Sequence, residues 1–65
     1  MILEVEYLDE SIEIINIEKI RITEKIIEIT SVRGIKKIIA FQDTNKIMLD
    51  SSVIFVGKKF LSMFF

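Results

Sequence analysis

The fold class depends most on residues 11–30, which read SIEIINIEKIRITEKIIEIT. Nine of these positions are isoleucine, and apolar and polar residues alternate over Ile12–Ile14 and Ile20–Ile22. Alternation with a period of two is typical of a half-buried strand. A helix over Ser11–Thr30 is the alternative, because several isoleucines partly fit a 3.6-residue period. We favour strands, since β-branched side chains lose rotamer freedom in a helix and pack well on a pleated sheet.

Two pairs of adjacent isoleucines, Ile14-Ile15 and Ile26-Ile27, interrupt this alternation. We interpret each pair as a change in which side chains face the core. A β-bulge or bend produces such a change, and small barrels use bulges to curve a sheet. A strand that is buried on both faces is the alternative explanation of Ile14-Ile15. The residues predicted to point inward in the first part of the stretch are Ile12, Ile14, Ile15 and Ile17.

Shorter apolar segments flank this stretch on both sides. Before it, Ile2–Leu8 alternates, with Glu4 and Glu6 on one solvated face. After it, Arg33-Gly34 is the clearest turn, because glycine adopts a positive φ at no steric cost. The polar cluster Gln42–Asn45 is predicted to be a loop. The remaining predicted strands are Ile26–Val32, Ile35–Phe41, Lys46–Leu49 and Val53–Val56, with turns at Asp9–Ser11, Thr23–Lys25 and Asp50–Ser52.

Short β segments at turn spacings of this kind predict an all-β fold. We expect a small antiparallel meander, or an SH3-like or partly open barrel, of five to seven short strands. Residues 58–65 are predicted to form a last strand, a short C-terminal helix or an arm. At 65 residues the chain is expected to be one small β domain, residues 1–65.

The residue types that are missing restrict the chemistry. The chain has no Cys and no His, which removes disulfides, thiol chemistry and the usual zinc ligands. Gly57-Lys58-Lys59 lacks the first glycine and the hydroxyl residue of a phosphate-binding loop. We therefore expect no enzyme, no catalytic residues, no cofactor and no metal site.

Hydrophobic residues make up 51% of this short chain, and its mean hydropathy is +0.48. A monomer of this size has to leave many of them in contact with water, and it has no disulfide or metal to stabilise it. The composition therefore predicts a homo-oligomer. The residues predicted to form the interface are Phe60, Leu61, Phe64 and Phe65.

Charge is distributed unevenly along the chain. Residues 1–30 contain eight acidic and three basic residues, a net charge of −5, whereas residues 31–65 contain two acidic and six basic residues, a net charge of +4. One hypothesis is that the basic part binds an anion or a partner. The other, which we favour, is that acidic and basic strands pair within the sheet or across a dimer. The candidate ligand- or partner-binding residues are Arg33, Lys36, Lys37, Lys58 and Lys59.

The leading functional hypothesis is a non-catalytic, homo-oligomeric binding protein that occupies a host protein or sequesters an anionic small ligand such as a nucleotide signal. A composition typical of AT-rich genomes favours a low-GC bacterium or a phage, in which a small protein of this kind acts as an inhibitor in anti-defence. We expect a cytoplasmic protein with no membrane partner, because no apolar run approaches the ~20 residues of a membrane span.

Two alternatives remain. One is a nucleic-acid-binding small β barrel that uses the basic C-terminal half, although a net charge of −1 and a pI near 5.3 count against it. The other is a structural or assembly subunit.

Overall fold

The computed structural model describes residues 1–57, which form six β-strands and one short 3₁₀ helix. The all-β prediction is therefore confirmed, and the helical alternative for Ser11–Thr30 is wrong. In chain order the elements are β1 (Ile2–Tyr7), β2 (Ile12–Ile22), β3 (Ile26–Ser31), β4 (Lys36–Ala40), η1 (Phe41–Asp43), β5 (Thr44–Leu49) and β6 (Ser52–Val56).

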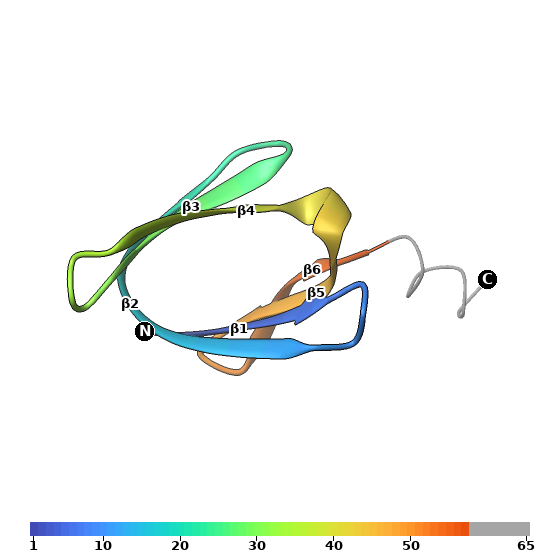
Figure 1. Cartoon of the computed structure of the whole chain (residues 1–65), viewed down its shortest axis with the longest axis horizontal. Helices are drawn as coiled ribbons and strands as arrows, with labels where there is room; N and C mark the ends of the chain where they lie inside the picture. Colours follow the sequence, from blue (N-terminus) through green and yellow to red (C-terminus); the bar gives the residue numbers. More distant parts are fainter. Residues whose placement is uncertain (58–65) are drawn as a thin grey trace.

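All six strands belong to one antiparallel sheet with the order β4-β3-β2-β1-β5-β6. β2 has 11 residues and pairs with β1 over its first part and with β3 over its second. We call β1, β5, β6 and the first part of β2 half-sheet A, and β3, β4 and the second part of β2 half-sheet B. In Figure 1 the two halves face each other, with β2 joining them on one side and η1 leading from β4 to β5 on the other. The result is a meander curled into a partly open barrel.

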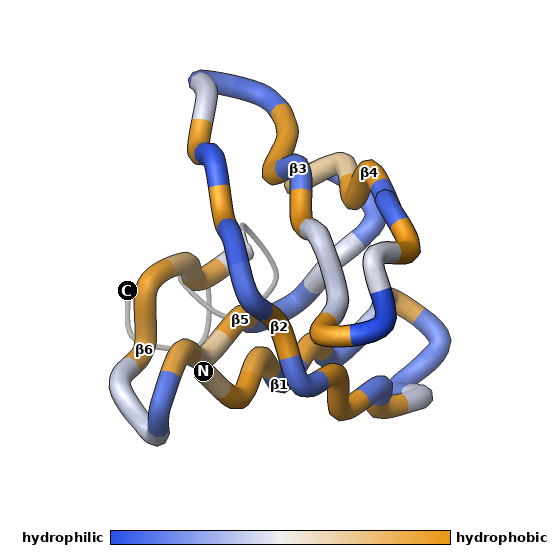
Figure 2. The backbone as a smooth tube through the Cα atoms, turned by 90° about the vertical axis from the view of Figure 1, so that its left-hand side faces the viewer, coloured by the Kyte–Doolittle hydropathy of each residue, from blue (hydrophilic) through white to orange (hydrophobic). Residues whose placement is uncertain are grey.

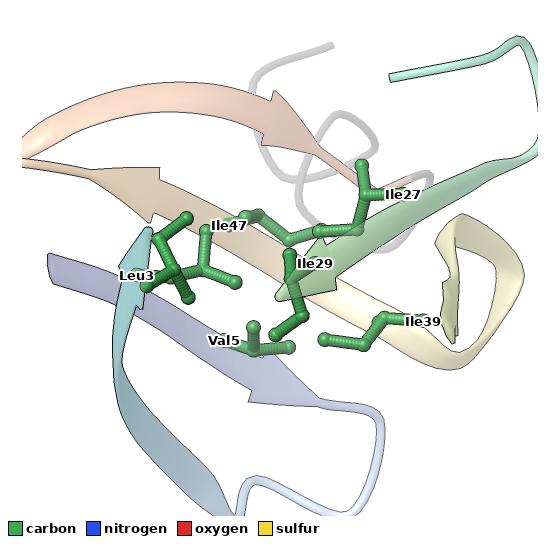
Figure 3. Close-up of a cluster of buried hydrophobic side chains, with 7 residues drawn as sticks. Leu3, Val5, Ile27, Ile29, Ile39 and Ile47 are labelled. Carbon is green, nitrogen blue, oxygen red and sulfur yellow. The ribbon is translucent and has the colours of Figure 1, made fainter. Parts of the chain in front are cut away.

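The core fills the space between the two halves. Side chains of Leu3, Val5 and Ile47 from half-sheet A converge on those of half-sheet B in Figure 3. Complete burial of one aliphatic side chain of this size stabilises a fold by roughly 1.5–3 kcal/mol, so this cluster holds the curled sheet together. Its seven buried members are Leu3, Val5, Ile17, Ile27, Ile29, Ile39 and Ile47.

β2 bends at a bulge, but not where the sequence predicts one. Ile17 pairs with Ser31 and Lys19 pairs with Thr30, which leaves Glu18 as the extra residue. The predicted change at Ile14-Ile15 is wrong, because the pairing of β1 with β2 continues through both residues without a shift.

The direction of the side chains in this part of β2 also differs from the prediction. Val5 is buried and pairs with Glu13, so Glu13 shares the inward face with Ile15 and Ile17. Ile12 and Ile14, predicted to be in the core, point outward and are 58% and 65% exposed. Figure 2 shows that apolar and polar residues alternate along β2. This alternation alone does not say which of the two sets of side chains faces the core.

Two further local predictions are wrong. β3 continues without a register shift through Ile26-Ile27, with Ile27 buried and Ile26 on the opposite face. The predicted loop at Gln42–Asn45 is instead the end of η1 followed by the start of β5, and Thr44 and Asn45 are buried. Thr44 Oγ1 donates a hydrogen bond to the Phe41 carbonyl and Asn45 Nδ2 donates one to the Tyr7 carbonyl, whereas Asn45 Oδ1 is buried without a hydrogen-bond partner among the described residues.

Other turn predictions are confirmed. Gly34 has φ +83°, the left-handed conformation that the turn between β3 and β4 requires. Asp50 and Ser51 form the two-residue turn between β5 and β6, with φ angles of 47° and 70°. At the open side of the barrel, the ring of Phe41 stacks on that of Phe55 with centroids 4.5 Å apart. This contact joins η1, which directly follows the edge strand β4, to β6, the other edge strand of the described sheet.

Candidate functional site

Three basic side chains share the outer face of half-sheet B. Residues that pair across neighbouring antiparallel strands project on the same side of a sheet. Since Ile27, Ile29 and Ile39 point into the core, their neighbours along each strand point outward. The pairing defines two outward rows across β2, β3 and β4, namely Lys19–Thr30–Lys36 and Arg21–Glu28–Ile38.

These two rows line a shallow groove with a volume of about 710 Å³. Arg21 Nη1 lies 3.8 Å from Glu28 Oε2, and the two side chains are 77% and 43% exposed. Such an exposed pair contributes at most about 1 kcal/mol and leaves the guanidinium accessible. Within residues 1–57, Lys19 and Lys36 form no ion pair. The groove therefore presents two ammonium groups outside the ion pairs of residues 1–57, one on each side of the Thr30 hydroxyl, and Glu18 also lines it next to Lys19.

The structure separates the candidate binding residues that the sequence suggests. Lys36 is part of this groove, whereas the next residue, Lys37, projects from the opposite face of β4. Arg33 is exposed in the turn between β3 and β4. The other candidates lie outside the described residues: Lys58 and Lys59, and the predicted interface residues Phe60, Leu61, Phe64 and Phe65.

Sequence reasoning missed Lys19, Arg21 and Thr30 as members of a site. Lys19 and Arg21 belong to the acidic part of the chain, and counting charge by sequence position concealed them. The alternation Ile20-Arg21-Ile22 does place Arg21 away from the core. What it does not supply is the pairing of β2 with β3 and of β3 with β4, which brings Lys36 to the same face.

A second charged cluster closes one end of the core. Lys37 Nζ donates hydrogen bonds to both carboxylate oxygens of Glu13, each 2.7 Å long. The Tyr7 hydroxyl donates to Glu13 Oε1 over 2.5 Å. Glu13 belongs to the acidic part of the chain and Lys37 to the basic part, but β2 and β4 do not pair, so this contact links half-sheet A to half-sheet B across the inside of the curled sheet.

The pKa shifts in this cluster indicate a structural role. The hydrogen bonds from Lys37, and then from Tyr7, lower the pKa of Glu13. The bond to Glu13 raises the pKa of Lys37, and burial followed by the bond to Glu13 raises the pKa of Tyr7. A general acid or base works best with a pKa near the ambient pH. All three shifts move the groups further from neutrality, so the cluster orients side chains and does not suit proton transfer.

The outer face of half-sheet A carries several exposed apolar side chains beside charged ones. Ile2, Ile12, Ile14 and Val53 are each about half exposed or more and project from this face, whereas on the strands of half-sheet B only Ile38 of the described residues does so. The pairing defines two rows across β2, β1, β5 and β6, namely Ile12–Glu6–Lys46–Val56 and Ile14–Glu4–Met48–Val53.

A groove of about 770 Å³ lies beside the Phe41–Phe55 stack and is lined mainly by apolar side chains, among them Leu8, Ile26 and Val56. Gly57, the last described residue, also lines it. Because the chain continues from this rim into residues 58–65, we assign the groove no ligand.

No protein-family model, curated protein or solved structure matches this chain. The two outer faces are therefore interpreted from their own chemistry.

Over residues 1–57 there is no helix with the length and apolar character needed to cross a membrane. The same residues contain no group of three or more acidic side chains placed to hold a metal ion.

Proposed function

We propose that this protein is a non-catalytic binding protein that holds an anionic small ligand, such as a nucleotide, on the outer face of half-sheet B. The observation that carries the proposal is the row Lys19–Thr30–Lys36, in which two ammonium groups flank a hydroxyl on three adjacent strands. Strands in a sheet are about 4.8 Å apart, so the backbones at Lys19 and Lys36 are separated by about 10 Å. Long lysine side chains on this spacing can converge on one phosphate group over Thr30.

The neighbouring row limits what the rest of the ligand can be. Glu28 repels a second anionic group at the centre of the groove, and Arg21 already has Glu28 as a partner. Ile38 is 64% exposed and offers an apolar surface beside Lys36. A ligand with one phosphate-bearing end and one flat, less polar end, such as a nucleotide, matches this order of side chains.

The test is a calorimetric titration of the full-length protein with ATP and, separately, with inorganic phosphate at low ionic strength. Lys36→Gln and Lys19→Gln should each weaken ATP binding about tenfold, because each removes a hydrogen bond to a charged group worth roughly 1.5 kcal/mol. Binding should also weaken as salt is added, since the contacts are exposed.

Lys25→Gln is the matched control, since it removes the same charge from the exposed turn between β2 and β3. It should change the ATP affinity less than twofold. Equal losses for Lys25→Gln and Lys36→Gln would mean that net charge and not this groove attracts the anion. The absence of binding to both probes at low salt would contradict the proposal.

A single-stranded oligonucleotide in the same titration tests the nucleic-acid alternative. Affinity that grows with oligonucleotide length and exceeds that for ATP would favour the alternative, because each added phosphate contact increases the salt-dependent attraction.

Self-association and a cytoplasmic location are part of the proposal. Action as a phage-encoded inhibitor stays a prediction, and a gene position among housekeeping genes would contradict it.

A further inference from the structure

We infer that the outer face of half-sheet A is the surface on which a second copy of this chain docks, face to face, about a twofold axis. The inference names the surface for the self-association included in the proposed function. It does not involve the groove on half-sheet B, so each can fail without the other.

The first argument is the uneven distribution of exposed apolar side chains. Ile2, Ile12, Ile14 and Val53 project from the outer face of half-sheet A, against Ile38 from the outer face of half-sheet B. Ile22, on the half-sheet B part of β2, is 56% exposed but pairs with buried Ile27 and so lies on the other side of the sheet. Scattered single apolar residues are normal on a protein surface, whereas a group of them on one side of one sheet marks an interaction site.

The second argument is that this face is complementary to itself. A twofold interface brings the same patch of both copies together, so the patch must tolerate its own rotated image. Consider an axis that runs parallel to the strands, between β1 and β5 and above the sheet. Rotation by half a turn about this axis places β1 of one copy over β5 of the other, and β2 over β6.

This rotation matches the two rows, side chain by side chain. In the row Ile12–Glu6–Lys46–Val56, each apolar end meets the other apolar end, and each Glu6 meets a Lys46. In the row Ile14–Glu4–Met48–Val53, Ile14 meets Val53. Glu4 opposite Met48 is the single mismatch, since a carboxylate facing a thioether loses water without gaining a partner.

The size of the face indicates a weak dimer. Four strands at about 4.8 Å spacing and about five residues at 3.3 Å each give a footprint of roughly 300 Å². Two such faces bury roughly 600 Å² in all, which is below the ~1,200 Å² at which stable specific interfaces begin and is in the range of weak contacts. We therefore expect a dimer that dissociates on dilution.

Sedimentation equilibrium of the full-length protein over a wide concentration range tests the inference. The wild-type chain should show a reversible monomer–dimer equilibrium. Ile14→Lys should weaken dimerisation at least about tenfold, because it places an ammonium group against apolar Val53. Ile38→Lys is the matched control: Ile38 is 64% exposed against 65% for Ile14, but it lies on the outer face of half-sheet B. The dimer dissociation constant of Ile38→Lys should stay within about twofold of that of the wild-type chain.

A mixing experiment tests the axis itself and guards against variants that simply fold poorly. Val53→Glu should dissociate the dimer as Ile14→Lys does. An equimolar mixture of Ile14→Lys and Val53→Glu should dimerise again, since the axis brings the new lysine of one copy to the new glutamate of the other.

Three results would overturn the inference: a monomeric wild-type chain at every concentration, equal losses for Ile14→Lys and Ile38→Lys, or a mixture that stays monomeric. Retained ATP binding by Ile14→Lys would show that such a failure leaves the proposed anion site intact.

Discussion

At the scale of single residues, Glu13 explains why the isoleucine pattern was misleading. A carboxylate that faces the interior loses hydration, and the Lys37 ammonium and the Tyr7 hydroxyl compensate it with hydrogen bonds. Because Glu13 faces inward, its neighbours Ile12 and Ile14 face outward. Alternation alone defines two faces but does not say which of them is buried.

Glu13→Gln should lower the free energy of unfolding by about 1 kcal/mol near neutral pH. The substitution removes the charge that binds Lys37, in a pair whose side chains are 43% and 35% exposed and therefore partly screened by solvent. Urea denaturation followed by circular dichroism measures the difference. Glu24→Gln, in the exposed turn between β2 and β3, is the control and should be nearly neutral.

The same variant should show how stability depends on pH. The pKa of Glu13 is lowered in the folded state, chiefly by Lys37, so the unfolded chain takes up a proton at a higher pH than the folded chain does. The stabilisation that the ionised Glu13 carboxylate contributes is present above pH 4.5, the ordinary pKa of glutamate. It is lost as the pH falls through the lower pKa of Glu13 in the folded chain. The wild-type chain should therefore lose stability on acidification more steeply than Glu13→Gln. Parallel curves would contradict this account.

At the scale of elements, the sequence defines turns better than it defines bulges. The turn at Gly34 follows from glycine, the residue type that adopts φ +83° without steric strain. The bulge at Glu18 has no such signal, because it arises where β2 leaves β1 and begins to pair with β3. The start of β5 was missed because Thr44 and Asn45 are polar residues that the fold nevertheless buries.

Ser51→Gly should stabilise the turn between β5 and β6 by about 0.5–1 kcal/mol. Ser51 has φ 70°, and glycine removes the steric strain of this conformation at a smaller entropic cost. Asp50 is left unchanged, because its Oδ1 accepts a 2.8 Å hydrogen bond from the Ile2 backbone N–H. Thermal unfolding gives the shift. Ser52→Gly, the first residue of β6, should have the opposite sign, and a loss of stability for Ser51→Gly would contradict the strain argument.

At the scale of the whole molecule, the division of charge along the chain did not locate the candidate site. The groove on half-sheet B combines Lys19 and Arg21 from the acidic part with Lys36 from the basic part. Only the order of strands in the sheet brings these residues together. The all-β class depends on local periodicity and was predictable, whereas the two outer faces depend on pairing between distant segments and were not.

The Phe41–Phe55 stack should couple the two edges of the barrel by about 0.5–1.5 kcal/mol, the usual range for an aromatic pair. A double-mutant cycle with Phe41→Leu, Phe55→Leu and the combined variant measures this coupling from denaturation curves. The leucines keep most of the apolar volume, so the cycle isolates the ring contact. Strictly additive effects would mean that the stack adds nothing beyond burial of each ring.

The order of strands also bears on how the chain folds. Each of the pairs β1–β2, β2–β3, β3–β4 and β5–β6 joins consecutive strands, and such hairpins form locally and fast. The pairing of β1 with β5 alone joins distant segments, with Leu3 opposite Leu49. Closing that long loop lowers the chain entropy before any stabilising contact between β1 and β5 forms. We therefore expect the pairing of β1 with β5 to limit the folding rate. During synthesis, a chain that ends before Thr44 can form its first hairpins, but without β5 and its core residue Ile47 it cannot yet enclose its core.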